Sequence, residues 1–329
     1  MASVPGKVSV VIPFFNTQES FLREAVESAL QQEGVSLEIL LVDDGSDAGA
    51  TSIAIDLAQS SQGRVRYLAH PDGLNRGTSA TRNLGVSESA GEFIAFLDSD
   101  DVWRPAKLAE QIEVFAALPD VVLVFGQSEY WFDRQPGSGD APQGFVPDAG
   151  ARNRRVLHPP EFVSGFLRGR IIVPNPSNFM VRRTAYEACG GFEDSFPGMY
   201  DDQVFLAKIG LQNDVCVVPR CWDRYRQHEN SLSAQARFRS TEEAARRRFL
   251  IWLRQYIRDR GVYEPDIAEA ISKELWLCAQ ADHDYESSER RWVRWGKKWL
   301  LRLEETVIPP KVRQLWWCRE NQPKDQGRR

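Results

Sequence analysis

The chain has 329 residues, 42% of them hydrophobic, and a formal net charge of −5 at pH 7. This is ample chain for one large domain with an extension. No stretch approaches the roughly 18 to 20 apolar residues of a spanning helix, and the amino terminus lacks the apolar core of a signal peptide. Five scattered cysteines without a CxxC pair indicate reduced thiols of the cytosol rather than a disulfide framework.

The first hundred residues alternate between predicted strands and helices. The strands have nearly continuous apolar runs, as in a sheet covered on both faces, and the helices have apolar residues at helical spacing. Such alternation implies parallel strands with right-handed crossovers. The expected strands are 8–12, ending at Pro13, then 37–42, 65–69 and 93–97; the expected helices are 18–32, 51–60 and 78–89.

Polar residues follow three of these strands. The first is followed by Pro13 to Asn16, the second by Asp43 to Ser46, and the last by Asp98-Ser99-Asp100-Asp101. Open α/β sheets bind ligands just beyond such strand ends. Crowded carboxylates repel one another unless a divalent cation neutralises them, and such a cation can bridge the two phosphates of a nucleotide-linked substrate. The alternative is that these residues cap loops and helices, as Asp43 and Ser46 could do.

Several motifs together resemble family 2 inverting glycosyltransferases of the GT-A fold. They are VSVVIPFFN, EILLVDDGS, the Gly77–Gly85 stretch with Arg82-Asn83, and FIAFLDSDDVWRP. Further motifs follow in the family's order, at Pro176–Asn178, Gly190–Glu193, Tyr200–Asp202 and Tyr225–His228. The resemblance covers roughly residues 6 to 234. It implies an α/β fold with a mostly parallel, Rossmann-like central sheet and helices on both faces.

The resemblance implies a site for the nucleotide of the donor. Phe15 matches an aromatic residue, commonly Tyr, that stacks on the base, although a core position is the alternative. Asp44 matches a carboxylate that accepts a hydrogen bond from the base in members that use uridine donors. Pro13 and Asn16 are assigned to the same donor-binding group.

The resemblance also implies a site for the donor diphosphate and a Mn²⁺ or Mg²⁺ ion. Asp100 is expected to bind the cation directly, with His228 completing its shell, while Asp98 contacts the ribose or a metal-bound water. Arg82 and Arg226 are expected to contact the phosphates through charge-assisted bonds. The alternative for Arg82 is an exposed arginine in a weak surface ion pair.

Asp201 and Asp202 match the catalytic acid pair of the family. Inverting transfer needs a general base that takes the proton from the attacking hydroxyl, and the second member, Asp202, matches it. The first member is usually Glu, so the supporting role of Asp201 is less well defined. The alternative is that both acids cap a helix beginning near Gln203.

The segment 235–329 is expected to form a helical, basic and Trp-rich extension of a catalytic domain at 1–234. That domain is expected to divide into a nucleotide-sugar binding part (1–105) and an acceptor and catalytic part (106–234). The extension carries 21 Lys and Arg against 15 Asp and Glu, and seven of the ten tryptophans, which suggests a separate role. Within 290–303, three tryptophans share one helical face flanked by basic residues. Such a helix could lie on an anionic membrane or pack on the catalytic domain. Residues 134–160 are expected to form a surface loop.

We therefore expect a glycosyltransferase that moves a sugar, from a UDP-sugar by preference, onto a hydroxyl of a glycan, lipid-linked or other acceptor. The expected pathway is the assembly of cell-surface polysaccharide. The enzyme is expected in the cytoplasm, peripheral at the inner face of the membrane, and no nucleic-acid partner is expected. One alternative is a nucleotidyltransferase of similar α/β layout, although the chain lacks a Gly-rich phosphate loop after its first strand. The other is a non-catalytic protein that binds sugar nucleotides or a membrane surface.

Overall fold

The computed structural model describes residues 3–132, 144–229, 231, 234, 242–262 and 264–285, with side chains of the last helix to Cys278. One mixed nine-stranded sheet runs through this part of the chain in the order β3-β2-β1-β4-β8-β6-β9-β5, with β7 also paired to β9. Its first four strands are parallel. The strands are β1 (Val4–Phe14), β2 (Ser36–Asp43), β3 (Val65–Ala69), β4 (Gly91–Phe96), β5 (Val102–Trp103), β6 (Leu123–Phe132), β7 (Arg155–Leu157), β8 (Met180–Arg182) and β9 (Val215–Gln227).

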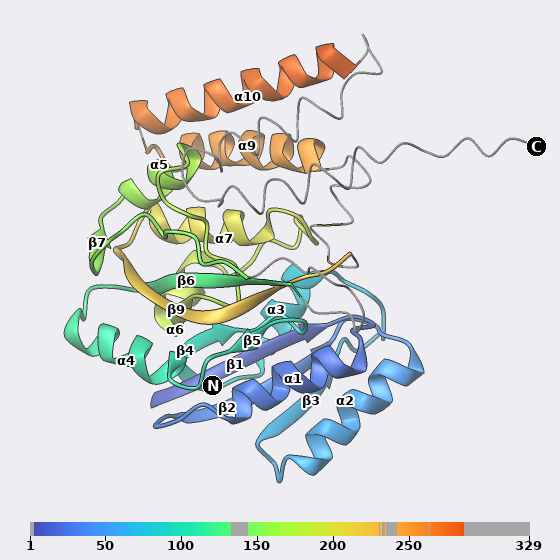
Figure 1. The fold of residues 1–329 in the computed structure, drawn as a ribbon. Coiled ribbons are helices and arrows are strands. Elements are labelled where there is room, and N and C mark those ends of the chain that lie inside the picture. Colours follow the sequence, from blue (N-terminus) through green and yellow to red (C-terminus); the bar gives the residue numbers. More distant parts are fainter. Residues whose placement is uncertain are drawn as a thin grey trace, which may run out of the picture.

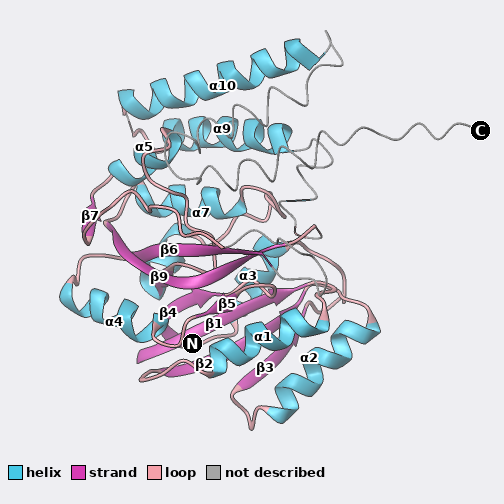
Figure 2. Cartoon of the chain, viewed as in Figure 1, coloured by secondary structure: helices cyan, strands magenta, loops and turns pink. Residues whose placement is uncertain are grey.

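Helices cover both faces of the sheet (Figures 1 and 2). One face carries α1 (Glu19–Leu30), α2 (Ala48–Ser60) and α4 (Lys107–Ala117). The opposite face carries α3 (Thr78–Ser87), α5 (Glu161–Leu167), α6 (Arg183–Cys189) and α7 (Asp201–Gly210). Beyond α7 lie α9 (Glu242–Asp259) and α10 (Pro265–Tyr285), stacked as further layers in Figure 1.

The alternation of side chains along β1 explains why both faces need cover. Val8, Val10 and Ile12 belong to the core on the α1 side, while Val11 belongs to the core on the α7 side. All four are fully buried, as expected for a strand whose successive side chains point to opposite faces. The predicted α/β architecture with a Rossmann-like sheet is confirmed.

Two predicted boundaries near the strand ends were wrong. β1 does not stop before Pro13 but continues to Phe14, with Pro13 opposite Val42 of β2. A proline is tolerated there because the ladder between β1 and β4 has already ended at Val11, so that β1 has a neighbouring strand on one side only. Helix α2 begins at Ala48 rather than at 51, and its cap is Asp47, whose carboxylate accepts from the N–H groups of Gly49 and Ala50 at 2.9 and 3.0 Å.

The predicted loop at 134–160 was partly wrong. Its residues 134–143 lie outside the described part of the chain, but β7 pairs antiparallel with β9, with Leu157 opposite Val215. Leu157 is fully buried in the core. The alternation of apolar and polar residues in this segment is too short to predict a strand. The strand forms because β9 offers it a partner.

Helices α9 and α10 share the core on the α7 side of the sheet. Phe249, Leu250 and Leu253 of α9 and Ile267 and Ile271 of α10 are buried there. No helix in the described residues combines the length and apolar character needed to cross a bilayer. The segment 290–303 lies outside the described residues, and the division of the chain at 234 stays a prediction.

Candidate functional site

The loop after β4 is fixed by Asp101, the last of its three acids. Asp101 is fully buried and accepts from the Ser177 hydroxyl at 2.6 Å and from the backbone N–H of Arg226 at 2.9 Å. Ser177 also accepts from the N–H of Asp98 at 3.0 Å. Burial, together with the charges of Asp100 and Asp98, raises the pKa of Asp101 well above its usual value. Asp101 therefore anchors the loop, while Asp98 and Asp100 remain partly exposed.

Asp100 and His228 face each other across the end of the sheet. The Nε2 atom of His228 lies 2.9 Å from Oδ2 of Asp100, and both side chains are partly exposed. The edge of the Phe21 ring packs against the imidazole, with ring centroids 5.2 Å apart. Two ligands in adjacent octahedral positions, each about 2.1 Å from a cation, are about 3.0 Å apart. The two side chains form a hydrogen bond here, and their spacing is also that of two neighbouring ligands of one Mg²⁺ or Mn²⁺ ion.

No group of three or more His, Cys, Asp or Glu side chains within the described residues is arranged to hold a metal alone. A cation on Asp100 and His228 would need its remaining ligands from water and substrate. This is how Mg²⁺ is commonly held, by one or two carboxylates together with substrate phosphates.

Arg226 is buried directly behind this pair. Its guanidinium lies 4.1 Å from the ring centroid of Phe21 and 4.2 Å from that of Trp131. Nε donates to the backbone carbonyl of Asp100 at 2.7 Å, and Nη2 pairs with Glu24 at 2.5 Å. These contacts hold the backbone of Asp100 in place, and a phosphate contact of Arg226 stays a prediction.

Arg82 joins the loop after β4 to the N-terminus of α7. Its Nη2 donates to Asp98 at 2.7 Å and its Nη1 donates to Asp201. The alternative of an exposed arginine was wrong, because only 4% of the side chain is accessible to water. Burial opposes its charge, but the carboxylates of Asp98 and Asp201 raise the pKa of Arg82, so it remains cationic.

The acid pair occupies the first turn of α7, which begins at Asp201 rather than near Gln203. Asp201 also accepts from the Thr78 hydroxyl at 2.8 Å. Asp202 accepts from the N–H of Gln203 at 2.7 Å. Burial raises the pKa of Asp202 to about 7, and the neighbouring carboxylate of Asp201 adds to the effect. A carboxyl group with this pKa can accept a proton near neutral pH.

The ends of β1 and β2 carry the residues predicted to bind the nucleotide. Phe15 is 50% exposed, whereas its neighbour Phe14 is buried, so the core alternative for Phe15 was wrong. Asp44 accepts from the N–H groups of Arg76 and Gly77 at 2.7 and 3.1 Å. The side chain of Asn16 accepts from the N–H of Asp47 at 2.8 Å. Pro13 is buried in β1, so its contribution would be to shape the strand end.

The acids, the arginine and the histidine thus converge at one edge of the sheet. Residues 9–190 match the model of glycosyl transferase family 2, which is more than half of the chain. The chain belongs to glycosyl transferase family 2.

Curated relatives of this family 2 chain match shorter stretches. It is 42% identical over 106 residues to the succinoglycan biosynthesis protein ExoO of Rhizobium meliloti, covering 32% of this chain and 29% of that protein. It is 36% identical over 118 residues to an uncharacterized glycosyltransferase of Nostoc, covering 36% and 35%. It is 30% identical over 200 residues to the O-antigen biosynthesis protein RfbC of Myxococcus xanthus, covering 60% and 14%. The matches span about a third or less of each relative.

Solved structures share the fold of this family 2 chain. S. aureus TarS in complex with UDP has a TM-score of 0.58 at 16% identity, covering 82% of this chain and 70% of that one. The mannosyltransferase PcManGT of Pyrobaculum calidifontis, in complex with GDP-Man and Mn²⁺, has a TM-score of 0.55 at 17% identity, covering 90% and 80%. At these identities the likeness shows the GT-A fold alone.

Two residues of the family 2 site were not predicted from the sequence. Ser177 lies in a recognised motif, but the groups of Asp98 and Asp101 that it bonds are 76 or more residues away in the sequence. Thr78 holds Asp201 across 123 residues. Its position directly after Gly77, at the start of α3, was the available signal, because hydroxyl groups at helix starts commonly bond to nearby groups.

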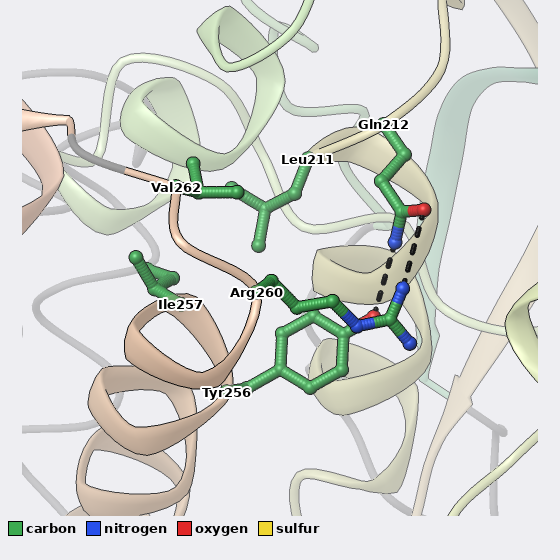
Figure 3. A pocket seen from close by; sticks show the side chains of 6 residues that line it. All are labelled: Leu211, Gln212, Tyr256, Ile257, Arg260 and Val262. Atoms are coloured by element: carbon green, nitrogen blue, oxygen red, sulfur yellow. Dashed lines mark hydrogen bonds between the residues drawn. The ribbon is translucent and has the colours of Figure 1, made fainter.

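A pocket at the other end of α7 lies away from these acids (Figure 3). Gln212 donates to the Tyr256 hydroxyl at 3.1 Å and accepts from Arg260 at 3.4 Å. The polar groups that line it therefore bind one another. Because α7 has ten residues, about 15 Å of helix separates this pocket from Asp201, and we assign it no catalytic role. Its lining residues are Leu211, Gln212, Tyr256, Ile257, Arg260 and Val262.

Proposed function

We propose that the protein is a metal-dependent inverting glycosyltransferase that transfers a sugar from a nucleotide diphosphate donor to an acceptor hydroxyl. One observation carries the proposal. Arg82 bonds Asp98, on the side predicted to hold the donor, and Asp201, next to the predicted base Asp202. The groups predicted to bind the diphosphate and to accept the proton are therefore linked through one guanidinium, which supports the proposal.

Asp100 and His228 would hold the cation, with Asp98 beside them on the ribose or a metal-bound water. A bound Mn²⁺ or Mg²⁺ would supply positive charge to the diphosphate as it departs. The nitrogen ligand favours Mn²⁺, which accepts a mixed nitrogen and oxygen shell more readily than Mg²⁺. Arg226 would orient Asp100 through the backbone carbonyl of that residue, and Arg82 would add a second positive charge near the phosphates.

Asp202 would act as the general base. The acceptor oxygen attacks the anomeric carbon, its proton passes to the Asp202 carboxylate, and the bond from that carbon to the diphosphate oxygen breaks. Attack and departure on opposite sides of the carbon invert its configuration. A positioned base contributes roughly 10² to 10⁴ in rate. Asp201 would support it by fixing the first turn of α7 through Arg82 and Thr78.

We infer a UDP-sugar as the donor. The exposed ring of Phe15 can stack on a base. Asp44, directly after β2, has a carboxylate that matches the one accepting a hydrogen bond from the base. The complex of S. aureus TarS with UDP supports this choice. The complex of PcManGT with GDP-Man makes guanosine the rival base.

We infer cell-surface polysaccharide assembly as the setting, with a glycan or lipid-linked hydroxyl as the acceptor. The names of ExoO and RfbC, which refer to succinoglycan and O-antigen biosynthesis, support this inference. The basic, Trp-bearing segment 290–303 would place the enzyme at the inner face of the membrane. Deleting the residues after 285 should abolish co-sedimentation with anionic liposomes, and unchanged sedimentation would refute membrane binding.

The central experiment measures release of nucleotide diphosphate from UDP-glucose, UDP-N-acetylglucosamine, UDP-galactose and GDP-mannose, with Mn²⁺ and with EDTA. Water can replace the unknown acceptor in this assay. We expect metal-dependent release from a UDP-sugar, and a fall of about 10² or more in kcat for Asp202→Asn. Equal rates for the wild type and Asp202→Asn would refute the assignment of the base.

A further inference from the structure

The residue that precedes the acid pair has a strained backbone. Tyr200 has a φ of +70°, in the left-handed region that residues with side chains rarely adopt. Such a conformation persists only where surrounding contacts impose it. The ring of Tyr200 is stacked on the ring of Phe249 in α9, with centroids 5.5 Å apart and planes at 17°. The start of α7 is therefore held by a helix from the C-terminal segment.

The same face of α9 holds the loop that leads to Tyr200. Arg248 donates to the backbone carbonyl of Ser195, and its guanidinium lies 4.9 Å from the ring centroid of Phe196. Trp252 packs its ring against Phe196 at 6.0 Å. Positions 248, 249 and 252 lie on one side of a helix. The exposed Arg254 lies on the other side.

The opposite side of this loop is held by α3. The Ser79 hydroxyl donates to the carbonyl of Phe196 at 2.6 Å, and Thr78 donates to Asp201 at 2.8 Å. The segment 195–202 thus lies between α3, which carries Arg82, and α9. A shift of α9 would move the acids relative to Arg82.

We propose that Arg248, Phe249 and Trp252 are positioning residues that hold segment 195–202, and with it the catalytic acids, in the productive place. The inference rests on the proposed function, since it takes Asp202 as the base. It gives α9 a role in supporting the active site, whereas the sequence suggested a separate role for the chain after residue 234. A misplacement of about 1 Å can cost roughly 10²-fold in rate, so small changes in this contact should be measurable.

The pH profile gives a readout that general stability would not move. Asp202 is surrounded by Asp201, Arg82 and Asp98, while Glu242 and Arg246 of α9 face Tyr200. Asp202 is partly exposed already. If the contact with α9 loosens, more water reaches its carboxyl group, and its pKa moves down toward the usual value. In variants that loosen this contact, the acid limb of the pH profile of kcat should move to lower pH, while kcat itself falls.

The experiment uses the full chain with the variants Arg248→Ala, Arg248→Lys and Phe249→Leu, and Arg254→Ala as the matched control on α9. The probe is UDP release from UDP-N-acetylglucosamine with Mn²⁺. For Arg248→Ala and Phe249→Leu we expect kcat to fall about 10- to 100-fold, with the donor KM within about twofold of wild type. Arg248→Lys keeps a donor and a cation and should recover much of the loss, and Arg254→Ala should behave as wild type.

Amide hydrogen exchange tests the positioning without turnover. In Arg248→Ala and Phe249→Leu, exchange of residues 196–204 should rise about tenfold over that of Arg254→Ala. Unchanged exchange in Arg248→Ala and Phe249→Leu would overturn the inference. So would a kcat and an acid limb of the pH profile equal to those of Arg254→Ala, or a loss of kcat that merely follows the unfolded fraction of the protein. If the wild type releases no UDP, the proposed donor reaction fails, and the exchange data still decide on the contact with α9.

Discussion

Arg82 donates a hydrogen bond to Asp201, although 119 residues separate them in the sequence. The same guanidinium bonds Asp98 at 2.7 Å. One cation therefore joins the strand end expected to bind the donor to the helix start expected to carry the base. Because all three groups are largely withdrawn from water, the charge of Arg82 offsets repulsion between the acids that would otherwise be costly.

Replacing Arg82 with Met should lower the free energy of unfolding by about 3 kcal/mol, because it leaves two partly buried carboxylates without their cation. Urea denaturation followed by circular dichroism measures this. The matched control is Arg23→Met, since Arg23 and its partner Glu19 are about half exposed and such a pair contributes at most about 0.5 kcal/mol. Equal losses in the two variants would contradict the bridging role.

The activity should depend on pH through Asp202. Burial raises its pKa to about 7, and a general base acts only when deprotonated. The kcat for donor turnover should therefore rise with pH through about 7 and level off above it. A profile that stays flat between about pH 5 and 8 would show that another group accepts the proton.

Stability should show the opposite dependence on the same carboxyl group. Its folded pKa lies above the unfolded value of about 3.9, so its contribution is fully present below about pH 3.9 and is lost as the pH rises through about 7. Asp202→Asn should thus melt at a higher temperature than wild type at pH 8, with a difference that shrinks toward pH 4. The control is Asp56→Asn on α2, where Asp56 is exposed; it should show no such trend.

The parts of the fold that could be predicted from the sequence were those with a local pattern. The apolar runs of β2 and β4 and the carboxylates after them follow from alternation and strand ends. The end of β1 could not be predicted, because whether Pro13 stops a strand depends on Val42 opposite it. Likewise the strand at Leu157 exists because β9 offers it a partner.

The candidate site shows the same limit. The acids could be named from their motifs, but the partners that fix them come from distant chain. Ser177 bridges Asp98 and Asp101, and Arg226 inserts between Phe21 and Trp131. The sequence left open an exposed position for Arg82 in a surface ion pair, yet its side chain is buried because α7 brings Asp201 to it. Such placements depend on packing between distant segments, which local patterns in a single sequence do not show.

Metal binding should depend on His228, because we propose that it binds the cation together with Asp100. With UDP present, Mn²⁺ should raise the melting temperature of the wild type, since a ligand that binds the folded state stabilises it. His228→Ala should lose most of this shift. The control is His158→Ala, because His158 also pairs with a carboxylate, Asp214, at 2.9 Å but is 72% exposed and lies outside the sheet, directly after β7. A full shift in His228→Ala would remove His228 from the proposed metal site.

Phe15 offers a direct test of base stacking, because it is half exposed and contributes little to the core. Stacking on an aromatic face is worth about 1–3 kcal/mol per base, so Phe15→Ala should raise the Kd for UDP about 5- to 150-fold. Phe15→Tyr keeps the face and should bind within a few-fold of wild type. Isothermal titration calorimetry with Mn²⁺ measures both, and Trp276→Ala, which removes a 60% exposed aromatic residue from α10, is the control. If Phe15→Ala binds UDP as tightly as Trp276→Ala, the base stacks elsewhere, and the assignment of the β1 end to the nucleotide would have to be abandoned.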